Sequence, residues 1–387
     1  MPRFEPFAGL RYDAARVDLG DVTAPPYDVI GPDERARLEA RSPFNVVQID
    51  LPGGQYDSAA RRFEDWQRDG VLTLDPEPAF YVYRMGYHDE VGRARQTAGV
   101  IGALELAVPG EGDVLPHERT MPKPKSDRLD LMRATRANLS PVWGLSLATG
   151  LSALCELPGP PDVRCTDEDG VHHRLWRITQ PGIVDAIADA VASAAIVIAD
   201  GHHRYETALA YRDEIGTPAS QCLMAYVVEL ADEQLTVRPI HRLLNGLPDG
   251  FDLPVAFGRW FDVFDAGPAT ETLGNRMADA AALALVTPTG AFLLRPKPDA
   301  FPPDIEDLDS ARLDVALRDL PAELTYQHGV DLAVAAVEKG DAQATVLMRP
   351  ATVVQIAAAA HARRRMPEKS TFFWPKPRTG LVFRPLS

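Results

Sequence analysis

The sequence has few cysteines, no long apolar run and no excess of positive charge. Only three of its 387 residues are cysteines, Cys155, Cys165 and Cys222, and no two of them have CxxC spacing. This usage fits a reducing compartment and argues against a structural zinc site. The N-terminal MPRFEPFAGLRYD lacks an uninterrupted apolar stretch, and no segment approaches the length of a membrane-spanning helix. We therefore expect a cytoplasmic protein that does not enter a membrane.

The formal net charge of -15 argues against a protein whose main work is to grip nucleic acid. Phosphate contacts of that kind need a clustered positive surface, although a local basic pocket stays compatible with this charge. The apolar fraction of 45% and the charged fraction of 25% are those of an ordinary folded protein. A chain of this length exceeds what one hydrophobic core supports, so more than one domain is expected.

Alternating helix and strand patterns predict an α/β fold with a mixed sheet. The patterns include a helix opened by Pro32 and Asp33, a strand from Asn45 to Leu51, a hairpin of residues 79–88 and 97–107, and a hairpin of residues 165–178. A composition change near residues 246–254 suggests three parts. They are an α/β core at 1–248, a smaller supporting α/β domain at 249–350, and a C-terminal helix and tail at 351–387 that packs back on the core.

One short segment carries the strongest functional signal. Ala195–Ala199 is an apolar, β-branched run typical of a covered strand, and helical spacing follows from Tyr205. The turn between them is Asp200-Gly201-His202-His203, with Arg204 behind it. Glycine allows close backbone approach, and the first turn of a helix offers unpaired N–H groups at the positive end of the helix dipole. We expect a phosphate to bind at Gly201, His202, His203 and Arg204, with Asp200 serving as a general base or metal ligand.

Two plainer interpretations of this turn stay open. Asp200 could simply cap a helix whose two histidines lie at the surface, or the histidines could bind a metal, although no third ligand stands at a diagnostic spacing. A similar string, Asp169-Gly170-Val171-His172-His173-Arg174, lacks a preceding apolar strand. We assign that histidine pair to the solvated face of a hairpin strand.

The string DGHHRYETALAYR resembles the phosphate-binding turn of the ParB and sulfiredoxin superfamily, and the Asp-Gly-His-His-Arg variant resembles that of its free-serine kinases. More broadly, the chain resembles the family known as domain of unknown function 1015. That resemblance rests on APPYDVI, LPHERTMPKPKSDRL, ATRANLSP, ADGHHRYETA, RPIHRLL and MPEKSTFFWPKPRTGL. The superfamily resemblance implies a ParB/sulfiredoxin-like core that binds ATP or ADP with Mg²⁺. His202 stands where sulfiredoxins have their reactive cysteine, which argues against sulfinic acid repair.

A proline-rich loop could complete such a site. Basic side chains and carboxylates alternate from His117 to Arg128, and magnesium phosphate needs both kinds. We expect Lys125 to act in catalysis by offsetting charge in the transition state, and Arg128 to bind the nucleotide. Glu118 is expected to act in catalysis or hold magnesium, and Asp127 to bind magnesium. The alternative is a solvated loop with surface ion pairs. Secondary candidates are Tyr27 and Asp28 at a pocket edge, His241 and Arg242 after a strand, and the tail residues Lys369, Ser370, Thr371 and Lys376.

The turn and its resemblance together imply a nucleotide-dependent phosphotransferase that acts on a small, serine-like hydroxyl metabolite. Two other functions stay open at this point. One is a nucleotide sensor that binds without turnover, and the other is a phosphatase acting on a phosphorylated amino acid. The partners are therefore a nucleotide and a small-molecule substrate, while the acceptor and the oligomeric state are left open by the sequence.

Overall fold

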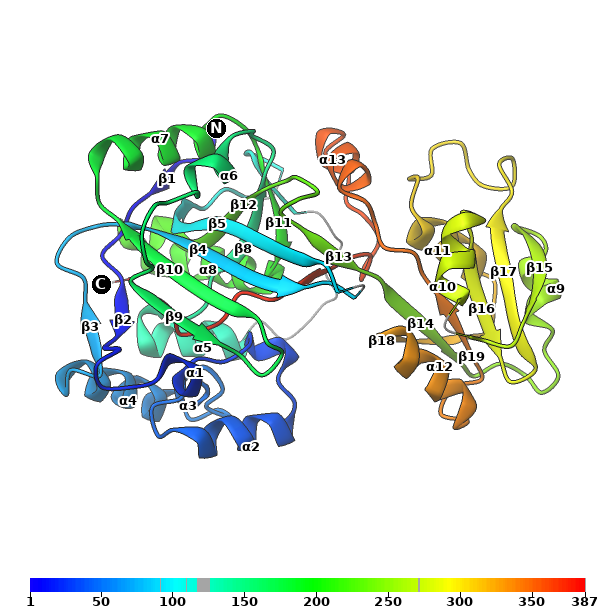
Figure 1. The fold of residues 1–387 in the computed structure, drawn as a ribbon, viewed down its shortest axis with the longest axis horizontal. Coiled ribbons are helices and arrows are strands. Elements are labelled where there is room, and N and C mark those ends of the chain that lie inside the picture. The colour runs from blue at the N-terminus through cyan, green and yellow to red at the C-terminus, as the bar shows by residue number, and fades with distance from the viewer. Residues whose placement is uncertain (91, 109, 117–125, 271, 387) are drawn as a thin grey trace. The chain divides into compact units, whose positions relative to one another are not determined.

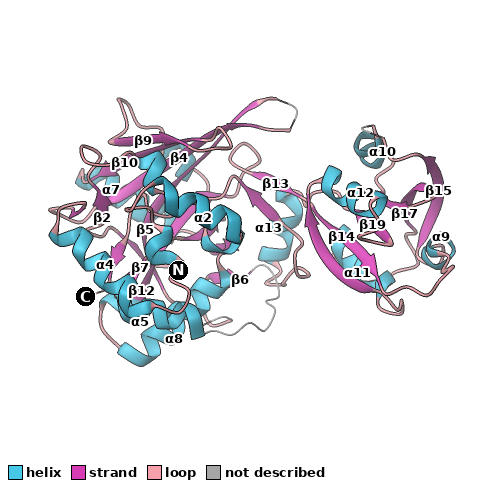
Figure 2. Ribbon diagram, turned by 90° about the horizontal axis from the view of Figure 1, so that it is seen from below, coloured by secondary structure: helices cyan, strands magenta, loops and turns pink. Residues whose placement is uncertain are grey.

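The computed structural model divides the chain into two compact units, each with its own sheet (Figures 1 and 2). The structure describes residues 1–90, 92–108, 110–116, 126–270 and 272–386. Within these residues, unit 1 comprises 1–116, 126–236 and 375–386, and unit 2 comprises 237–374. Among the described helices, none combines the length and the apolar character needed to cross a bilayer.

Unit 1 is built on a mixed sheet, which confirms the α/β class. In the described residues its strand order is β6-β11-β8-β12-β5-β4-β10-β9, with β1 added beside β5. Strand β12 runs parallel to β8 and β11 runs parallel to β6, whereas the other neighbours are antiparallel. The strands of this sheet are β1 Phe4–Glu5, β4 Phe80–His88, β5 Ala94–Glu105, β6 Val114–Pro116, β8 Val142–Ser146, β9 Val163–Thr166, β10 His172–Ile178, β11 Ile196–Asp200 and β12 Cys222–Glu229.

Short strand pairs and helices complete unit 1. The pairs are β2 Leu10–Tyr12 with β3 Leu72–Leu74, and β7 Ala137–Asn138 with β21 Arg384–Pro385. The helices are α1 Leu19–Val22, η1 Tyr27–Val29, α2 Pro32–Arg41, α3 Val47–Asp50, α4 Tyr56–Arg68, α5 Ser126–Thr135, α6 Leu151–Leu154, α7 Pro181–Ala192, α8 His202–Ile215 and η2 Ala219–Gln221. Prolines at the start of α2 and α7 suit the first helical turn, which needs no donor there.

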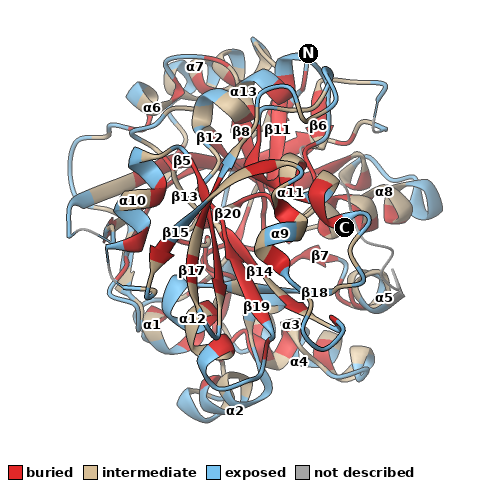
Figure 3. Cartoon of the chain, turned by 90° about the vertical axis from the view of Figure 1, so that its right-hand side faces the viewer, coloured by how far each residue is buried: buried red, intermediate tan, exposed pale blue. Residues whose placement is uncertain are grey.

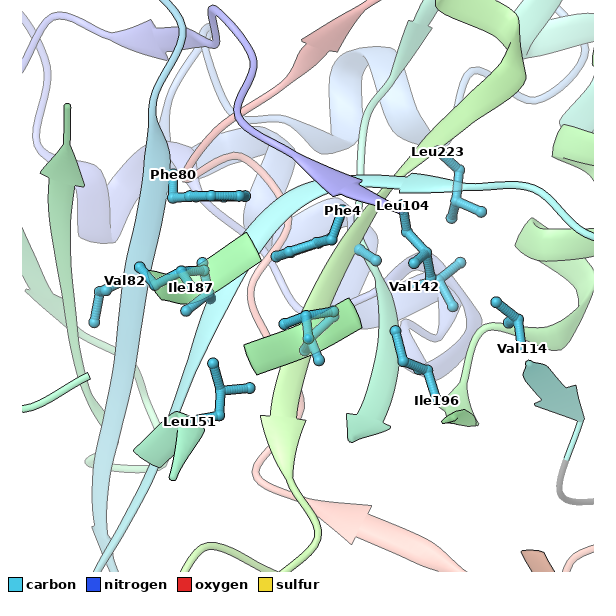
Figure 4. Packing of buried hydrophobic residues seen from close by; sticks show 14 of the residues in the cluster. Phe4, Phe80, Val82, Leu104, Val114, Val142, Leu151, Ile187, Ile196 and Leu223 are labelled. Carbon is cyan, nitrogen blue, oxygen red and sulfur yellow. The ribbon is translucent and has the colours of Figure 1, made fainter. Parts of the chain in front are cut away.

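Two apolar clusters hold unit 1 together. One buries α6, α7 and α8 against the sheet, and Figure 4 shows members of this cluster such as Phe80, Ile187 and Ile196. The other joins helices α1 to α5 to the β2–β3 pair. The strands β5, β8, β11 and β12 are mostly buried, whereas helices such as α2 and α7 carry exposed stretches (Figure 3). Truncating a fully buried side chain such as Ile187 to alanine would cost about 3 kcal/mol.

Unit 2 contains an antiparallel sheet with its own core. The strand order is β15-β17-β16-β19-β14-β18, and each neighbouring pair is antiparallel. Strand β13 (Thr236–Arg238), where the chain enters this unit, pairs with β20 (Phe372–Trp374). The remaining elements are β14 Ile240–Asn245, α9 Leu253–Phe257, β15 Phe261–Gly267, α10 Leu273–Asp279, β16 Leu283–Thr287, β17 Gly290–Pro296, α11 Asp309–Leu317, β18 Glu323–His328, α12 Val330–Glu338, β19 Ala344–Leu347 and α13 Val353–His361.

The unit boundaries differ from those expected from composition. Unit 2 begins at residue 237 rather than 249, because β14 pairs with β18 and β19 of the second sheet. Helix α13 also belongs to unit 2, and only residues from 375 onward return to unit 1. The change in composition lies in the loop after β14. The boundary lies before β14, because this strand forms its hydrogen bonds within the sheet of unit 2.

The expected strand from Asn45 to Leu51 is wrong, since this segment contains the short helix α3. The side chain of Asn45 accepts a hydrogen bond from the backbone N–H of Val47 at 3.1 Å. Such local bonds from asparagine favour turns and helix starts over extended backbone. Here that bond outweighs the strand preference of the valines that follow, and α3 places Asp50 in the interior.

Candidate functional site

The segment from Ile196 to Ile215 forms the predicted strand, turn and helix. Strand β11 lies between β6 and β8, and its first four residues are buried. The register with β8 shifts between Ile198 and Asp200. An irregularity of this kind bends a strand end and re-aims its side chains. The strand thus ends with Asp200 turned toward the start of α8.

Gly201 has a backbone that glycine alone adopts easily. Its φ is 89° and its ψ is 28°, in the left-handed region. A Cβ atom at this position would lie 2.9 Å from Nε of Arg204. Helix α8 begins directly afterwards, and no side chain caps its start. The interpretation of Asp200 as a helix cap is therefore wrong.

Asp200 instead receives two cations. One carboxylate oxygen bonds Nη2 of Arg204 at 2.5 Å, and the other contacts Nζ of Lys376. Burial alone would raise the pKa of Asp200, but the positive charges of Lys376 and Arg204 outweigh it and lower the pKa to about 2. A carboxylate with so low a pKa is a weak proton acceptor near neutral pH. We therefore assign Asp200 to positioning Arg204 and the C-terminal segment, in place of the general-base role expected for it.

Arg204 is itself buried and anchored. Besides Asp200, its guanidinium contacts the carbonyl oxygen of Pro141 and lies 3.5 Å from Oγ of Ser140. Its side chain lines a pocket in unit 1 with an empty volume of about 480 Å³, open mouth included. One part of the lining is apolar, formed by Leu131, Met132, Leu139, Val142, Ala208, Leu223 and Met224.

The polar part of the same pocket contains Tyr27, Asp50 and Arg128. The guanidinium carbon of Arg128 lies 4.2 Å from the centroid of the Tyr27 ring. Nη1 of Arg128 bonds Oδ1 of Asp50 at 3.1 Å and the backbone carbonyl of Asp50 at 2.7 Å. Burial raises the pKa of Asp50, and the charges of Arg128 and Arg204 only partly offset that effect. Sequence patterns do not single out Asp50, because they predict a strand for the segment that contains it.

Asp127, the predicted magnesium ligand, has both carboxylate oxygens engaged. Oδ1 accepts a hydrogen bond from the hydroxyl of Tyr56 at 2.7 Å, and Oδ2 accepts one from Arg128 at 2.9 Å. Burial opposes ionisation, but these bonds prevail and lower the pKa of Asp127. Among the described residues, no group of three or more His, Cys, Asp or Glu side chains is arranged to hold a metal ion. This arrangement does not favour direct coordination of magnesium by Asp127.

The other predicted site residues have mixed outcomes. Glu118 and Lys125 lie outside the described residues. His202 and His203 are half-buried in the first turn of α8. Of the predicted residues, Arg128 and Arg204 line the same pocket, joined by the secondary candidate Tyr27. Asp200 lies behind Arg204 as its ion-pair partner.

The look-alike histidine pair is only partly solvated, which corrects the expectation for it. His172 is exposed, but His173 points to the opposite face of β10 and is 1% exposed. Its Nδ1 lies 2.7 Å from the hydroxyl of Tyr83, and its Nε2 lies 3.0 Å from Asp167. The same Tyr83 hydroxyl accepts a bond from the backbone N–H of Arg378, two residues after Lys376. This network anchors the C-terminal segment that carries Lys376.

His241 belongs to the framework of unit 2. It lies on β14, and its Nδ1 accepts a hydrogen bond from the backbone N–H of Met348 at 3.1 Å. Burial lowers the pKa of His241 to about 4, so the ring is neutral near pH 7. These observations favour a structural role for His241.

Comparisons with known proteins agree with part of this description. A sequence profile described as "Protein of unknown function (DUF1015)" matches residues 4–316. The chain belongs to the DUF1015 family. This match confirms the family resemblance found in the sequence, and a search of curated proteins gives no match.

Several solved structures are similar to this DUF1015 protein. A conserved hypothetical protein from Pyrococcus furiosus has 14% identity and a TM-score of 0.38, over 70% of this chain and 90% of that chain. A free serine kinase in complex with AMP has 14% identity and a TM-score of 0.37, over 70% and 89%. C-terminally truncated SbnI from Staphylococcus aureus has 11% identity and a TM-score of 0.36, over 71% and 84%. Likenesses this weak assign no activity to the DUF1015 protein.

Proposed function

We propose that unit 1 binds a nucleotide, ATP or ADP, in the pocket between α5 and α8. The observation that carries the proposal is the lining of this pocket, which is apolar in one part and presents Arg128 and Arg204 in another. A nucleotide would match both parts of this lining, because its flat base favours apolar contacts and its phosphates favour guanidinium groups. Arg204 belongs to the first turn of α8, whose uncapped start adds backbone donors suited to an anion.

Both guanidinium groups bond carboxylates in this structure. Arg128 bonds Asp50 and Asp127, and Arg204 bonds Asp200. A bound phosphate therefore competes with these carboxylates for the same N–H donors. Asp50 is the partner that yields most readily, because its burial already favours the protonated form. Phosphate binding thus replaces an internal ion pair by an external one.

We further propose that the bound nucleotide donates its terminal phosphoryl group to a small hydroxyl compound. In this step the acceptor oxygen bonds to the terminal phosphorus, and the bond to the bridging oxygen breaks. The remaining nucleotide leaves with that electron pair, as ADP when ATP is the donor and as AMP when ADP is the donor. Asp50 takes the hydroxyl proton, a role for which a raised pKa is better suited than the lowered pKa of Asp200.

The proposed magnesium ion would be held chiefly by phosphate oxygens and water, which is its usual manner of binding beside a nucleotide. It would neutralise charge on the terminal phosphate groups. We propose that the acceptor of the phosphoryl group is a serine-like metabolite. The roles proposed for Glu118 and Lys125 rest on the alternation of basic and acidic side chains in the loop from His117 to Arg128.

Nucleotide sensing without turnover is the second candidate function. The observation that favours it is the double pairing of Asp200, which leaves the turn without the base that its sequence suggested. A sensor and a kinase would both bind nucleotide in this pocket. They differ in whether a phosphorylated product accumulates.

A thermal-shift panel of nucleotides with and without Mg²⁺ tests the binding step. A ligand present at 100 times its Kd would stabilise the protein by about 2.7 kcal/mol. Arg128→Gln should reduce the affinity for ADP about tenfold, since a hydrogen bond to a charged group is lost. Arg133→Gln on the same helix is the matched control, because Arg133 is half-exposed and pairs with Glu214 and Asp130. Equal affinity in the two variants would remove Arg128 from the site.

Mass spectrometry of small hydroxyl compounds incubated with ATP, Mg²⁺ and the protein tests the transfer step. A product heavier by one phosphoryl group, formed by the wild type and lost in Asp50→Asn, supports the kinase. Nucleotide binding without any such product supports the sensor. Release of inorganic phosphate from a phosphorylated amino acid without nucleotide would instead identify a phosphatase and overturn the proposal.

A further inference from the structure

Unit 2 contains a polar pocket of its own, separate from the proposed nucleotide site. Its empty volume is about 480 Å³, open mouth included. Among the residues that the structure describes, the lining contains three cationic side chains, Arg242, Arg349 and Lys369, and one carboxylate, Asp309. The formal net charge of the whole chain, by contrast, is -15.

Arg242 forms part of the buried wall of this pocket. Its side chain is 2% exposed. Its Nη1 donates to the carbonyl oxygen of Ile240 at 2.7 Å and its Nη2 to that of Glu368 at 3.3 Å, while the guanidinium carbon lies 4.7 Å from the ring centroid of Tyr326. A buried guanidinium is costly to desolvate, so several contacts are needed to hold it there. These contacts fix its orientation before any ligand arrives.

Arg349 is held in place by a fork-to-fork ion pair. Its Nε bonds Oδ2 of Asp309 at 2.8 Å, and its Nη2 bonds Oδ1 at 2.6 Å. The hydrogen bond with Asp309 raises the pKa of Arg349. This pair occupies one edge of the guanidinium and leaves the Nη1 edge outside the pair. A planar group oriented in this way suits recognition of a phosphate or a carboxylate.

Lys369 lies exposed at the rim in an uncommon backbone conformation. Its φ is 54°, in the left-handed region that costs a side-chain-bearing residue about 1 kcal/mol. The next residue fixes the segment, since the hydroxyl of Ser370 donates to the carbonyl of Pro367 and lies 2.7 Å from the hydroxyl of Ser310. Strained backbone of this kind is typical of segments that hold a ligand.

The start of helix α11 also lines the pocket. Leu308, Asp309 and Ser310 are among its lining residues, and no side chain caps the start of this helix. First-turn N–H groups without a side-chain cap are further donors for an anion. The cations, the helix start and the strained segment therefore share one preferred ligand chemistry.

We propose that this pocket is a second ligand site, which binds a small anion carrying a phosphate or a carboxylate group. Arg349 and Arg242 provide oriented donors, and Lys369 adds charge at the rim. The site is independent of the proposed nucleotide pocket, because its lining residues all belong to unit 2. It gives unit 2 a binding role of its own.

Isothermal titration calorimetry on the full-length protein tests the proposal, with inorganic phosphate and citrate as the two probes at constant ionic strength. Lys369→Gly removes the rim charge and suits the left-handed backbone. We expect it to weaken binding of the preferred probe about tenfold while the unfolding temperature of the ligand-free protein stays equal or rises. Lys339→Gln, at an exposed position after α12, is the matched control and should change neither quantity.

The results of these titrations distinguish a phosphate ligand from a carboxylate ligand, and a site in unit 2 from a site in unit 1. Binding of phosphate alone supports a phosphorylated ligand, and binding of citrate alone supports a carboxylate ligand, provided that Lys369→Gly weakens it. Arg128→Gln in unit 1 should leave this binding intact. Binding that disappears in Arg128→Gln but not in Lys369→Gly would overturn the proposal, as would the binding of neither probe.

Discussion

Replacing Gly201 by alanine perturbs the proposed site at one defined atom. The added Cβ would lie 2.9 Å from Nε of Arg204, and alanine would have to adopt the φ of 89°. The left-handed backbone alone costs about 1–2 kcal/mol. The contact is too short, so Arg204 must also shift from Asp200 and from the carbonyl of Pro141. We therefore expect a total loss of about 3 kcal/mol from the free energy of unfolding of unit 1.

Gly216→Ala on the same helix is the matched control. Gly216 ends α8 with a φ of 67°, and no atom lies within 4 Å of the Cβ that alanine would add. This variant should lose only the backbone cost of about 1–2 kcal/mol. Urea denaturation measures both losses, and calorimetry with ADP measures binding. Gly201→Ala should bind ADP at least tenfold more weakly than Gly216→Ala, because only the former displaces Arg204. Equal affinities would refute the assignment of Arg204 to the nucleotide pocket.

Three further predictions concern pH and charge. Asp200 has a pKa of about 2 in the folded protein against 3.8 for the free group. Unit 1 should therefore lose about 2 kcal/mol of stability as the pH falls from 4 to 2. Lys376→Met should reduce this loss in acid denaturation curves. His241 has a folded pKa of about 4 against 6.5 when free, so the unfolded chain binds more protons between these values. The stability of unit 2 should therefore be complete above pH 6.5 and fall by about 3 kcal/mol toward pH 4, and His241→Gln should flatten the slope measured by urea denaturation at several pH values. Asp50→Asn should bind ADP more tightly than the wild type, because the Asp50 carboxylate no longer competes with the phosphate for Arg128. The same variant should form no phosphorylated product. Weaker ADP binding in calorimetry would contradict the competition between Asp50 and phosphate.

Much of the local structure could be predicted from the sequence. Period-two patterns located the hairpin of β4 and β5, and the apolar run before Asp200 located β11. Pro181 marked the first turn of α7. These signals are local, since each depends on residues that are neighbours in the chain. They were strong enough to place the turn at Gly201 correctly.

The arrangement of the site depended on contacts between distant segments, which local patterns do not contain. The motif around Asp200 predicted a general base, but the ionisation of Asp200 depends on Lys376, which is 176 residues away in the chain. Asp50 was not predicted, because its segment forms a helix in place of the expected strand. At the start of this helix the backbone N–H of Val47 donates a hydrogen bond to the side-chain oxygen of Asn45. Likewise His173 looked solvated, although alternation along β10 turns it toward Tyr83.

A crystal structure of the full-length protein with ADP and Mg²⁺ tests the central claim most directly. We predict that the base lies against the apolar lining near Met132 and Leu223, and that the phosphates lie beside Arg128, Arg204 and the start of α8. We also predict that the bond between Arg128 and Asp50 opens in the complex. Density for ADP elsewhere on the chain, or an unchanged pocket at saturating ADP, would contradict this assignment of the nucleotide site.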